Sequence, residues 1–344
     1  MLSQHPPHGI AEAIRAAILR RALQTLLKPA FSPRRSVAFQ RRWLKTLSGF
    51  NRLPRGAEVV AAEVGGVAGE WVRRSAASGV AAHAAADSAA DGVVQGAGQW
   101  LYLHGGAYCL GSPRTHRNLS TRLALGSGMP VFMPDYRLAP ESRFPAALDD
   151  ALAVYRAMAA QGPVVVAGDS AGGGLALALA VALRDSGQPP PAALVLLSPW
   201  ADLVLEGEPP TPTRGEAMLS LEWAQACAEH YLGLDTPPSH PWVSPLRADL
   251  HGLPPTLIQA GTDEMLHGQA IALHDALAAA GVAVQCQITP RRWHVFQLHA
   301  GSLGSADAAL ARVLGFVEAV LAGGPGAAPR STPAPAPVSV TADA

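Results

Sequence analysis

One serine stands between two glycines at the end of an apolar segment. The segment is Val164-Val165-Val166-Ala167, and it leads directly into Gly168-Asp169-Ser170-Ala171-Gly172. An apolar stretch rich in small residues follows, so the pattern predicts a buried strand, a sharp turn and a buried helix. Such a turn would hold Ser170 in a strained conformation with its hydroxyl pointing out of the sheet. The alternative is an ordinary strand-to-helix turn whose serine caps the helix.

A second glycine turn follows a predicted strand at residues 99–103. Its sequence is His104-Gly105-Gly106-Ala107-Tyr108. Adjacent glycines let the backbone turn several N–H groups toward one point, which is what a developing oxyanion requires. Taken alone this is another glycine turn. Taken with Ser170, it predicts half of an oxyanion hole, with the N–H of Ala171 as the other donor.

The C-terminal third offers a base and an acid for the serine. A serine hydroxyl needs a base within hydrogen-bond reach, itself oriented by a third group. A predicted strand at residues 256–260 ends in Gly261-Thr262-Asp263-Glu264, and His294 follows the next predicted strand at 284–288. The order serine, acid, histidine is the one expected of the α/β-hydrolase fold. Asp263 is preferred as the acid because of its position at the strand end, and Glu264 stays open as the alternative.

Five motifs in order carry a resemblance to a known family. They are His104-Gly105-Gly106-Ala107-Tyr108, Asp135-Tyr136-Arg137-Leu138-Ala139-Pro140-Glu141, Gly168-Asp169-Ser170-Ala171-Gly172-Gly173, Ser198-Pro199-Trp200 and His294-Val295-Phe296. Together, from about Trp71 to Leu321, the chain resembles the hormone-sensitive-lipase family of α/β-hydrolase esterases. The resemblance implies an α/β fold with a mostly parallel central sheet, helices on both faces and an N-terminal helical cap.

The same resemblance implies roles for single residues. Ser170 would be the nucleophile, Asp263 the orienting acid and His294 the general base. The expected oxyanion donors are the backbone N–H groups of Gly105, Gly106 or Ala107, together with that of Ala171. Ala107 replaces a glycine found in many members, and its N–H is expected to serve if its φ is negative.

Three further residues near these motifs have expected roles. Tyr108 and Trp200 are candidates for the substrate pocket, although core packing is an equal alternative for Trp200. Asp169 is expected to hydrogen-bond the neighbouring backbone and fix the turn, because a buried carboxylate needs donors.

Length and composition fit one large domain with short additions. A chain of 344 residues with 49% hydrophobic residues can bury a sizeable core, and its zero net charge gives no reason to expect nucleic acid as a partner. Residues 1–52 are predicted to form the helical cap, 53–322 the catalytic domain and 323–344 a disordered tail rich in proline and alanine. Residues 75–98 are predicted to be a surface connection.

The N-terminal region is basic and helical in pattern. Its apolar residues recur at helical spacing and are Ile10, Ile14, Ile18, Leu19, Leu23, Leu26 and Leu27. A basic amphipathic helix can bind membranes. The family resemblance instead implies a cap whose apolar stripe faces the pocket, so the cap is preferred and no stable membrane anchor is expected. The longest apolar run, 171–183, is too short to cross a bilayer, and no signal-peptide pattern is visible.

The cysteines and the absence of cofactor motifs limit the expected cellular location and the expected cofactors. Cys109, Cys227 and Cys286 are far apart and lack a CxxC pattern, which favours buried free thiols and a cytoplasmic location. Cys109 follows the oxyanion loop and could modulate activity if oxidised. The sequence contains no phosphate loop, dinucleotide-binding glycine pattern or zincin motif, so no cofactor and no metal are expected.

The sequence therefore predicts a serine carboxylesterase that hydrolyses short- to medium-chain acyl esters through an acyl-enzyme. Its expected partner is a small-molecule ester, and a homodimer is left open. A lactone hydrolase, a lipase or an acyltransferase of the same fold remain alternatives, because pocket shape and not the triad sets the substrate. A non-catalytic binder of small molecules is the alternative from another class.

Overall fold

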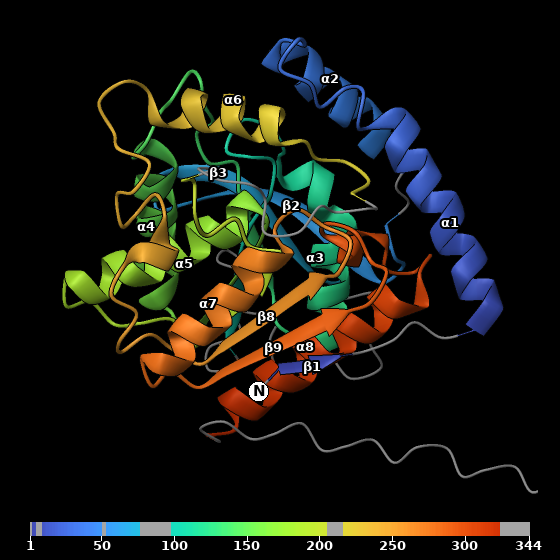
Figure 1. Ribbon diagram of the computed structural model, residues 1–344. Coiled ribbons are helices and arrows are strands. Elements are labelled where there is room, and N and C mark those ends of the chain that lie inside the picture. Colours follow the sequence, from blue (N-terminus) through green and yellow to red (C-terminus); the bar gives the residue numbers. More distant parts are fainter. Residues whose placement is uncertain (1, 5–8, 50–52, 76–97, 205–215, 324–344) are drawn as a thin grey trace, which may run out of the picture.

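The computed structural model describes residues 2–4, 9–49, 53–75, 98–204 and 216–323 (Figure 1). Within these ranges the strands form one nine-stranded sheet in the order β1-β9-β8-β7-β6-β4-β5-β3-β2. The strands are β1 (Leu2–Gln4), β2 (Ala57–Val64), β3 (Val67–Arg74), β4 (Gln99–Leu103), β5 (Val131–Pro134), β6 (Val164–Asp169), β7 (Ala193–Leu197), β8 (Thr256–Gly261) and β9 (Val284–Thr289).

The centre of the sheet is parallel, as predicted. Strands β4 and β6 to β9 run in the same direction, whereas β2 and β3 form an antiparallel pair and β3 lies antiparallel to β5. Strands β4, β6 and β7 are buried along their whole length. Near-continuous apolar runs are typical of parallel strands that are covered on both faces.

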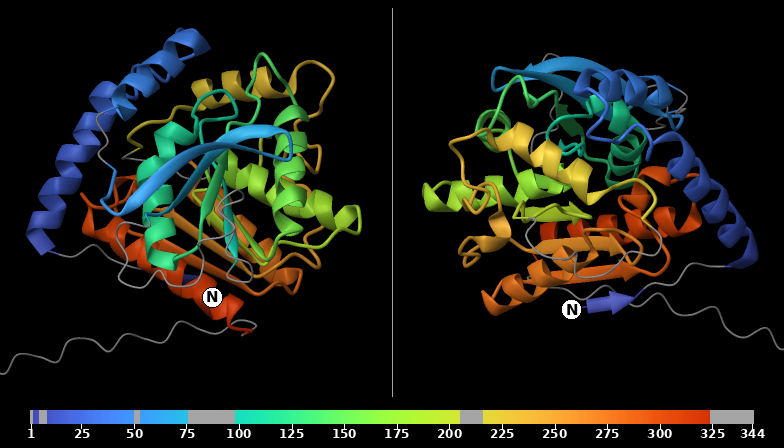
Figure 2. Two further views of the ribbon diagram at one scale, coloured as in Figure 1. Left: turned by 180° about the vertical axis from the view of Figure 1, so that it is seen from behind. Right: turned by 45° about the horizontal axis from the view of Figure 1, so that its top comes forward.

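Helices cover both faces of this sheet. They are α1 (Gly9–Leu26), α2 (Val37–Ser48), α3 (Pro113–Ser127), α4 (Ala146–Ala159), α5 (Ala171–Asp185), α6 (Leu221–Leu232), α7 (His267–Ala279) and α8 (Gly304–Leu321), with short 3-10 turns η2 (Pro245–Arg247) and η3 (Phe296–His299). Helix α3 packs against α8 on one face and α4 against α5 on the other (Figure 2). The predicted α/β architecture is thereby confirmed.

The first strand is an element that the sequence pattern did not predict. Leu2–Gln4 pairs in parallel with β9, with Leu2 opposite Cys286 and Gln4 opposite Ile288. A three-residue segment is too short to show strand periodicity, so this strand can be identified only from its pairing with β9. The predicted surface connection and the predicted tail lie largely outside the described residues, which omit 76–97 and 324–344.

Helix α2 and the turn before it form a cover beside α6. The rings of Phe31 and Trp223 stack with centroids 4.9 Å apart, and the indole N–H of Trp223 donates to Gln40 at 2.8 Å. Arg41 of α2 donates to the carbonyl oxygens of Cys109 and Ala139 at 2.7 Å each. Helix α2 therefore holds the loop that follows β4.

The apolar residues of α1 do not form the single inward stripe that the sequence analysis expected. Leu23 is buried and Leu19 packs on the core, whereas Ile10, Ile14 and Ile18 are exposed. Spacings of four along a helix place 10, 14 and 18 on one side and 19, 23 and 27 on another. Leu26, the seventh residue, is also exposed. This corrects the expectation that the whole stripe closes the pocket.

Among the residues described, no helix is both long enough and apolar enough to span a bilayer.

Candidate active site

Ser170 occupies the turn between β6 and α5 in a strained conformation. Its φ is 52° and its ψ is −123°, a region that residues other than glycine rarely adopt. The backbone is held there because the N–H of Ser170 donates to Leu197 at 2.9 Å and its carbonyl accepts from Trp200 at 2.9 Å. The side chain stands at the N-terminus of α5, where a helix carries partial positive charge. This is the backbone geometry expected of a nucleophile turn, with Ser170 itself largely buried.

Glycine is required where this turn meets β4. A Cβ atom at Gly172 would collide with the carbonyl oxygen of Leu103 and would crowd that of His104. A Cβ atom at Gly168 would collide with the carbonyl of Gly172 itself. The start of α5 therefore lies directly against the carboxyl end of β4. That approach places the N–H of Ala171 beside the loop at 104–108.

His294 follows β9, and its acidic partner is Glu264. The Nδ1 atom of His294 lies 3.5 Å from Oε2 of Glu264, and both side chains are buried. The same Oε2 accepts a hydrogen bond from the hydroxyl of Ser198 at 2.7 Å. In turn, the Ser198 oxygen accepts from the N–H of Val295 at 3.1 Å. Ser198 thus links the carboxylate to the turn that carries His294.

Asp263 does not face His294, which corrects the sequence expectation. Its Oδ2 forms an ion pair with Arg20 of α1 at 2.6 Å, and its Oδ1 accepts from the hydroxyl of Thr262 at 2.8 Å. The backbone N–H of Asp263 donates to the carbonyl of Arg292 at 2.9 Å. Successive residues in the turn point in different directions, so Glu264 reaches inward and Asp263 reaches α1. The alternative acid is therefore the one that the geometry brings to the histidine.

The surroundings of His294 favour its protonated form. Burial lowers the pKa of the imidazole, but the contact with Glu264 and its negative charge raise it by more, and the carboxylates of Glu216 and Asp169 act in the same direction. The pKa of His294 therefore lies above its ordinary value of about 6.5. A histidine with these neighbours can accept a proton and stabilise the resulting charge.

The loop after β4 differs in detail from the expected oxyanion hole. The N–H of Gly105 donates to Oδ1 of Asp169 at 3.0 Å and so is already engaged. Gly106 and Ala107 have φ angles of 129° and 52°, so the negative φ under which the N–H of Ala107 was expected to serve is not found. The N–H groups of Gly106, Ala107 and Ala171 donate to no residue within the described ranges. These three donors remain for an oxyanion.

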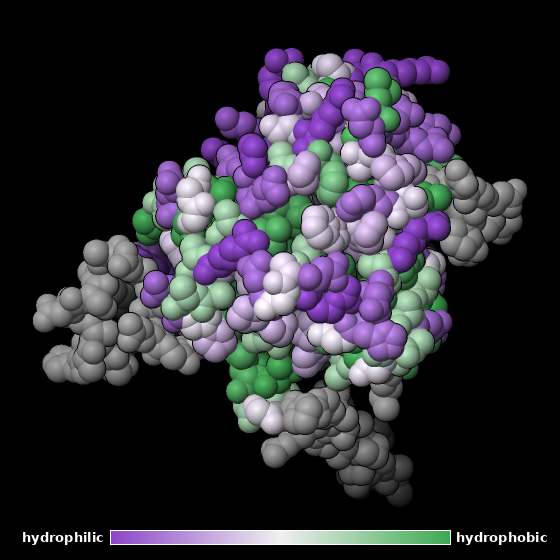
Figure 3. Space-filling model, turned by 90° about the vertical axis from the view of Figure 1, so that its left-hand side faces the viewer, coloured by the Kyte–Doolittle hydropathy of each residue, from purple (hydrophilic) through white to green (hydrophobic). Residues whose placement is uncertain are grey.

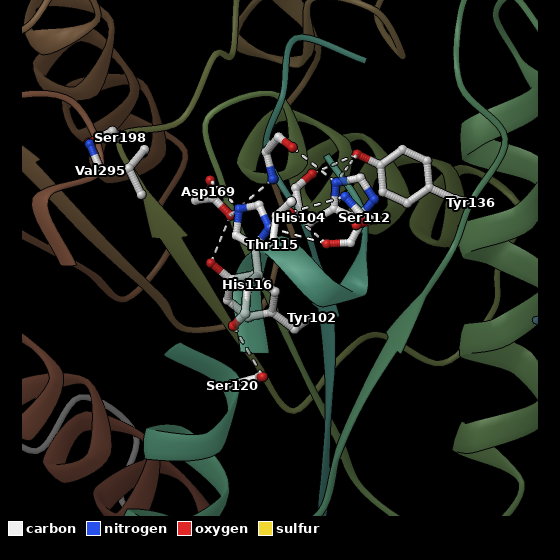
Figure 4. Close-up of polar contacts among 11 residues, drawn as sticks. Tyr102, His104, Ser112, Thr115, His116, Ser120, Tyr136, Asp169, Ser198 and Val295 are labelled. Carbon is white, nitrogen blue, oxygen red and sulfur yellow. Dashed lines mark hydrogen bonds and ion pairs between the residues drawn. The ribbon is translucent and has the colours of Figure 1, made fainter. Parts of the chain in front are cut away.

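A buried carboxylate supports this loop from below. Asp169 accepts from the hydroxyl of Tyr102 at 2.8 Å and from Gly105, and Nε2 of His116 lies 3.3 Å away (Figure 4). Burial raises the pKa of Asp169, but His116 and the two donors lower it by more. Burial likewise opposes protonation of His116, whose pKa is nevertheless raised by the charge of Asp169. Both shifts favour an ion pair between these two buried side chains, whose atoms approach to 3.3 Å.

His104 lies beside this pair and is neutral. Burial, with repulsion from His116, lowers the pKa of His104 to about 3. Its ring stacks on Tyr136 with centroids 4.3 Å apart, and the hydroxyl of Tyr136 donates to the carbonyl of His104 at 2.6 Å. The base of the loop is therefore rigid, because each polar contact is buried and is backed by an aromatic ring.

Three residues contribute to the site in ways that the sequence did not predict, namely His116, Ser198 and Glu216. His116 lies on α3, 53 positions from Asp169, and carries no local signal of its partner. Ser198 belongs to a recognised motif, but only the structure shows its hydrogen bond to Glu264. Glu216 accepts from the N–H of Met265, the residue after Glu264, at 2.8 Å.

The two candidate pocket aromatics are both buried. Tyr108 stacks on Tyr231 of α6 with centroids 3.8 Å apart, and Trp200 lies 6.2 Å from Tyr108 between centroids. The indole N–H of Trp200 donates to the carbonyl of Asp202 at 2.9 Å. Both rings pack beside residues of the serine turn.

The three cysteines are free and buried. Cys109 lies in the loop after β4 with its sulfur 3.8 Å from the carbonyl oxygen of Cys227. Within the described ranges, no group of three or more histidine, cysteine or acidic side chains is arranged to hold a metal ion.

Comparison with known proteins gives concordant matches. A family model described as alpha/beta hydrolase fold matches residues 100–298. An acetyl-hydrolase of Streptomyces hygroscopicus is 49% identical over 201 residues, which are 57% of this chain and 67% of the relative. LipR of Mycobacterium tuberculosis is 36% identical over 303 residues, covering 87% of this chain and 92% of LipR. The crystal structure of an esterase from the bacterial hormone-sensitive lipase family is 35% identical with a TM-score of 0.78, covering 91% and 99% of the two chains.

Proposed function

We propose, for a chain that belongs to the hormone-sensitive-lipase family of α/β-hydrolase esterases, that Ser170, His294 and Glu264 hydrolyse acyl esters through an acyl-enzyme. One observation carries this proposal. His294 and the buried carboxylate of Glu264 meet beyond the carboxyl ends of β8 and β9, at the sheet edge where β6 presents Ser170. The nucleophile Ser170, the acid Glu264 and the base His294 follow in the chain order expected of this fold.

In the first half-reaction, the Ser170 oxygen attacks the ester carbonyl while Nε2 of His294 takes the hydroxyl proton. Glu264 keeps Nδ1–H oriented and stabilises the imidazolium that forms. The 3.5 Å separation is longer than an ideal hydrogen bond, and such contacts often tighten only when the substrate or transition state is bound. His294 then returns the proton to the leaving alkoxide, and alcohol departs from acyl-Ser170.

In the second half-reaction, water attacks the acyl-enzyme by the same route. His294 takes a proton from the water and gives it to the oxygen of Ser170, which releases the carboxylic acid. In both halves the negative oxygen would be held by the N–H of Ala171 and by those of Gly106 or Ala107. Their preorganised dipoles stabilise charge that develops only in the transition state.

The proposed substrates are esters of short- to medium-chain acids. The name of the Streptomyces relative, acetyl-hydrolase, supports the short end of this range. The buried rings of Tyr108, Trp200 and Tyr231 beside the serine turn also favour a limited acyl chain. A series of nitrophenyl esters tests this: kcat/KM should peak at short or medium chains, and a steady rise toward long chains would contradict the assignment.

Covalent labelling tests the nucleophile. A fluorophosphonate should modify the purified chain at Ser170, and Ser170→Ala should lose both labelling and at least about 10³-fold of its turnover. Ser186→Ala is the matched control, since its hydroxyl donates to the carbonyls of Ala182 and Leu183 in α5 and accepts from the side chain of Gln188 in the turn after it. A protein that merely binds esters would not react, and substantial hydrolysis by Ser170→Ala would refute the proposal.

A further inference from the structure

Helix α1 has two apolar faces, and only one of them is covered. Leu23 and Ala16 are buried against the body of the protein. On the other side, Ile10, Ile14 and Ile18 are 82%, 57% and 64% exposed. A spacing of four residues aligns these three side chains along one side of a helix. We call them the outer stripe.

The helices around the outer stripe are strongly basic. Residues 9–49 contain nine lysines and arginines and one acid, Glu12, which gives a charge of +8. The whole chain has 26 basic and 26 acidic residues, so the rest of it carries −8. Glu12 is buried and pairs with Arg292 at 2.8 Å, so it offers no outward negative charge. The exposed cations of these two helices and their connection are Arg15, Arg21, Lys28, Arg34, Arg35, Arg42 and Lys45.

The opposite side of the molecule is different. Figure 3, which looks at the face away from α1, shows hydrophilic and hydrophobic side chains intermixed. Single exposed apolar residues of that kind need no explanation. An aligned isoleucine stripe flanked by cations is a more specific pattern, because it combines the two features with which a helix lies in a membrane interface.

We propose that α1 docks reversibly onto an anionic lipid bilayer, with Ile10, Ile14 and Ile18 among the acyl chains and the neighbouring cations at the lipid headgroups. The charge of the segment selects this occupant. Anionic lipid attracts nearby lysines and arginines. Two copies of α1 packed through their outer stripes would instead bring two segments of charge +8 together, and like charges repel.

The position of α1 gives the docking a consequence for the site. Arg20 of α1 contacts Asp263, which follows β8, and donates to the carbonyl of Arg291 at 3.0 Å. Arg20 therefore joins α1 to the two turns that carry Glu264 and His294. A docked α1 holds this end of the sheet near the membrane surface, where esters dissolved in lipid are concentrated.

Vesicle binding tests the proposal without relying on catalysis. The full chain should sediment with vesicles of phosphatidylglycerol and phosphatidylcholine, bind much less to phosphatidylcholine alone, and release when salt is raised from about 0.1 M to 1 M. The double variant Ile14→Glu/Ile18→Glu should bind at least about tenfold more weakly. Glutamate is a good helix former, and both sites are exposed, so the fold should persist.

Leu234→Glu is the matched control. Leu234 is 97% exposed and lies after α6, so this variant adds a negative charge without touching the outer stripe. It should bind vesicles as the unmodified chain does, and all variants should keep their rate on a water-soluble short ester. Failure of the unmodified chain to bind phosphatidylglycerol vesicles would overturn the proposal, as would unaltered binding by the double variant. A dimer in solution that Ile14→Glu/Ile18→Glu dissolves would also overturn it, in favour of a second copy.

Discussion

Oε2 of Glu264 lies 3.5 Å from Nδ1 of His294, and the two side chains are almost completely buried. The residue before Glu264 is also acidic, yet its carboxylate is bound by Arg20 on the other side of the turn. The two neighbouring acids point in opposite directions. Each can therefore be replaced by its amide in turn, with the other substitution as the control.

Glu264→Gln should lower kcat by about 10³- to 10⁴-fold, since an amide neither fixes the tautomer of His294 nor stabilises its charge. Asp263→Asn should lower kcat by less than about tenfold, because it only weakens a partly exposed ion pair with Arg20. Steady-state rates on a nitrophenyl ester measure both. If the two effects came out reversed, the acid would be Asp263 and the observed geometry would not be the catalytic one.

The acidic limb of the pH–rate profile should report His294. The imidazole must be neutral to act as base, and its pKa is raised above 6.5, so kcat/KM should fall as pH drops through a value above 6.5. Glu264→Gln removes the main cause of the upward shift, so the residual limb should move to lower pH. Asp263→Asn should leave the limb where it is. A profile that stays flat down to pH 5 would rule out His294 as the base.

The strands and the nucleophile were accessible from sequence because their signals are local. The run at Val164–Ala167 is buried and begins with three β-branched valines, and the glycines around Ser170 are required by contacts within the turn and with β4. The sequence could not show which of the two neighbouring carboxylates is the acid. Asp263 and Glu264 are adjacent and chemically alike, and what separates them is an arginine 243 positions away.

The oxyanion loop and α1 also depend on contacts that local sequence patterns do not predict. Two glycines after a strand indicate free N–H groups, but the carboxylate that occupies the N–H of Gly105 comes from Asp169, 64 residues later. Helical spacing predicts an apolar side for α1, but one inward stripe was expected where the structure has two. Which stripe faces inward depends on the surface against which the helix packs. The periodicity of the α1 sequence contains no information about that surface.

His116 should act as a positioning residue for the oxyanion loop. It orients Asp169, which holds the N–H of Gly105. In His116→Ala the carboxylate is free to shift, so kcat should fall roughly tenfold while KM changes less than about twofold, because the loop acts on the transition state. His116→Gln keeps a donor near Nε2 and should recover most of the rate.

The control for this experiment is His251→Ala, which removes a largely exposed histidine whose partner is Asp249. It should change neither constant. An equal loss in His116→Gln and His116→Ala would mean that His116 matters only for packing, and an unchanged kcat in His116→Ala would exclude the positioning role.

The buried pair of Glu12 and Arg292 should fix α1 to the turn before His294. Glu12 accepts from Arg292 at 2.8 Å and from the N–H groups of Gly304 and Ser305 at 2.9 and 3.0 Å. Glu12→Gln leaves the guanidinium of Arg292, itself only 2% exposed, without its anion. Breaking a buried pair costs about 3–5 kcal/mol, so urea unfolding at pH 7 should show a loss of about that size. Glu63→Gln, at an exposed position on β2, should show none.

The pH dependence of this loss has a definite sign. Burial raises the pKa of Glu12, but the hydrogen bonds from Ser305, Arg292 and Gly304 outweigh it, so the pKa is lowered. A carboxylate with a depressed pKa contributes stability above its unfolded value of about 4.3, and this stability is lost as pH falls through the folded pKa. The difference between the unmodified chain and Glu12→Gln should therefore be largest near pH 7 and shrink below pH of about 4. A difference that grows in acid would show that Glu12 is not held as a carboxylate by Arg292.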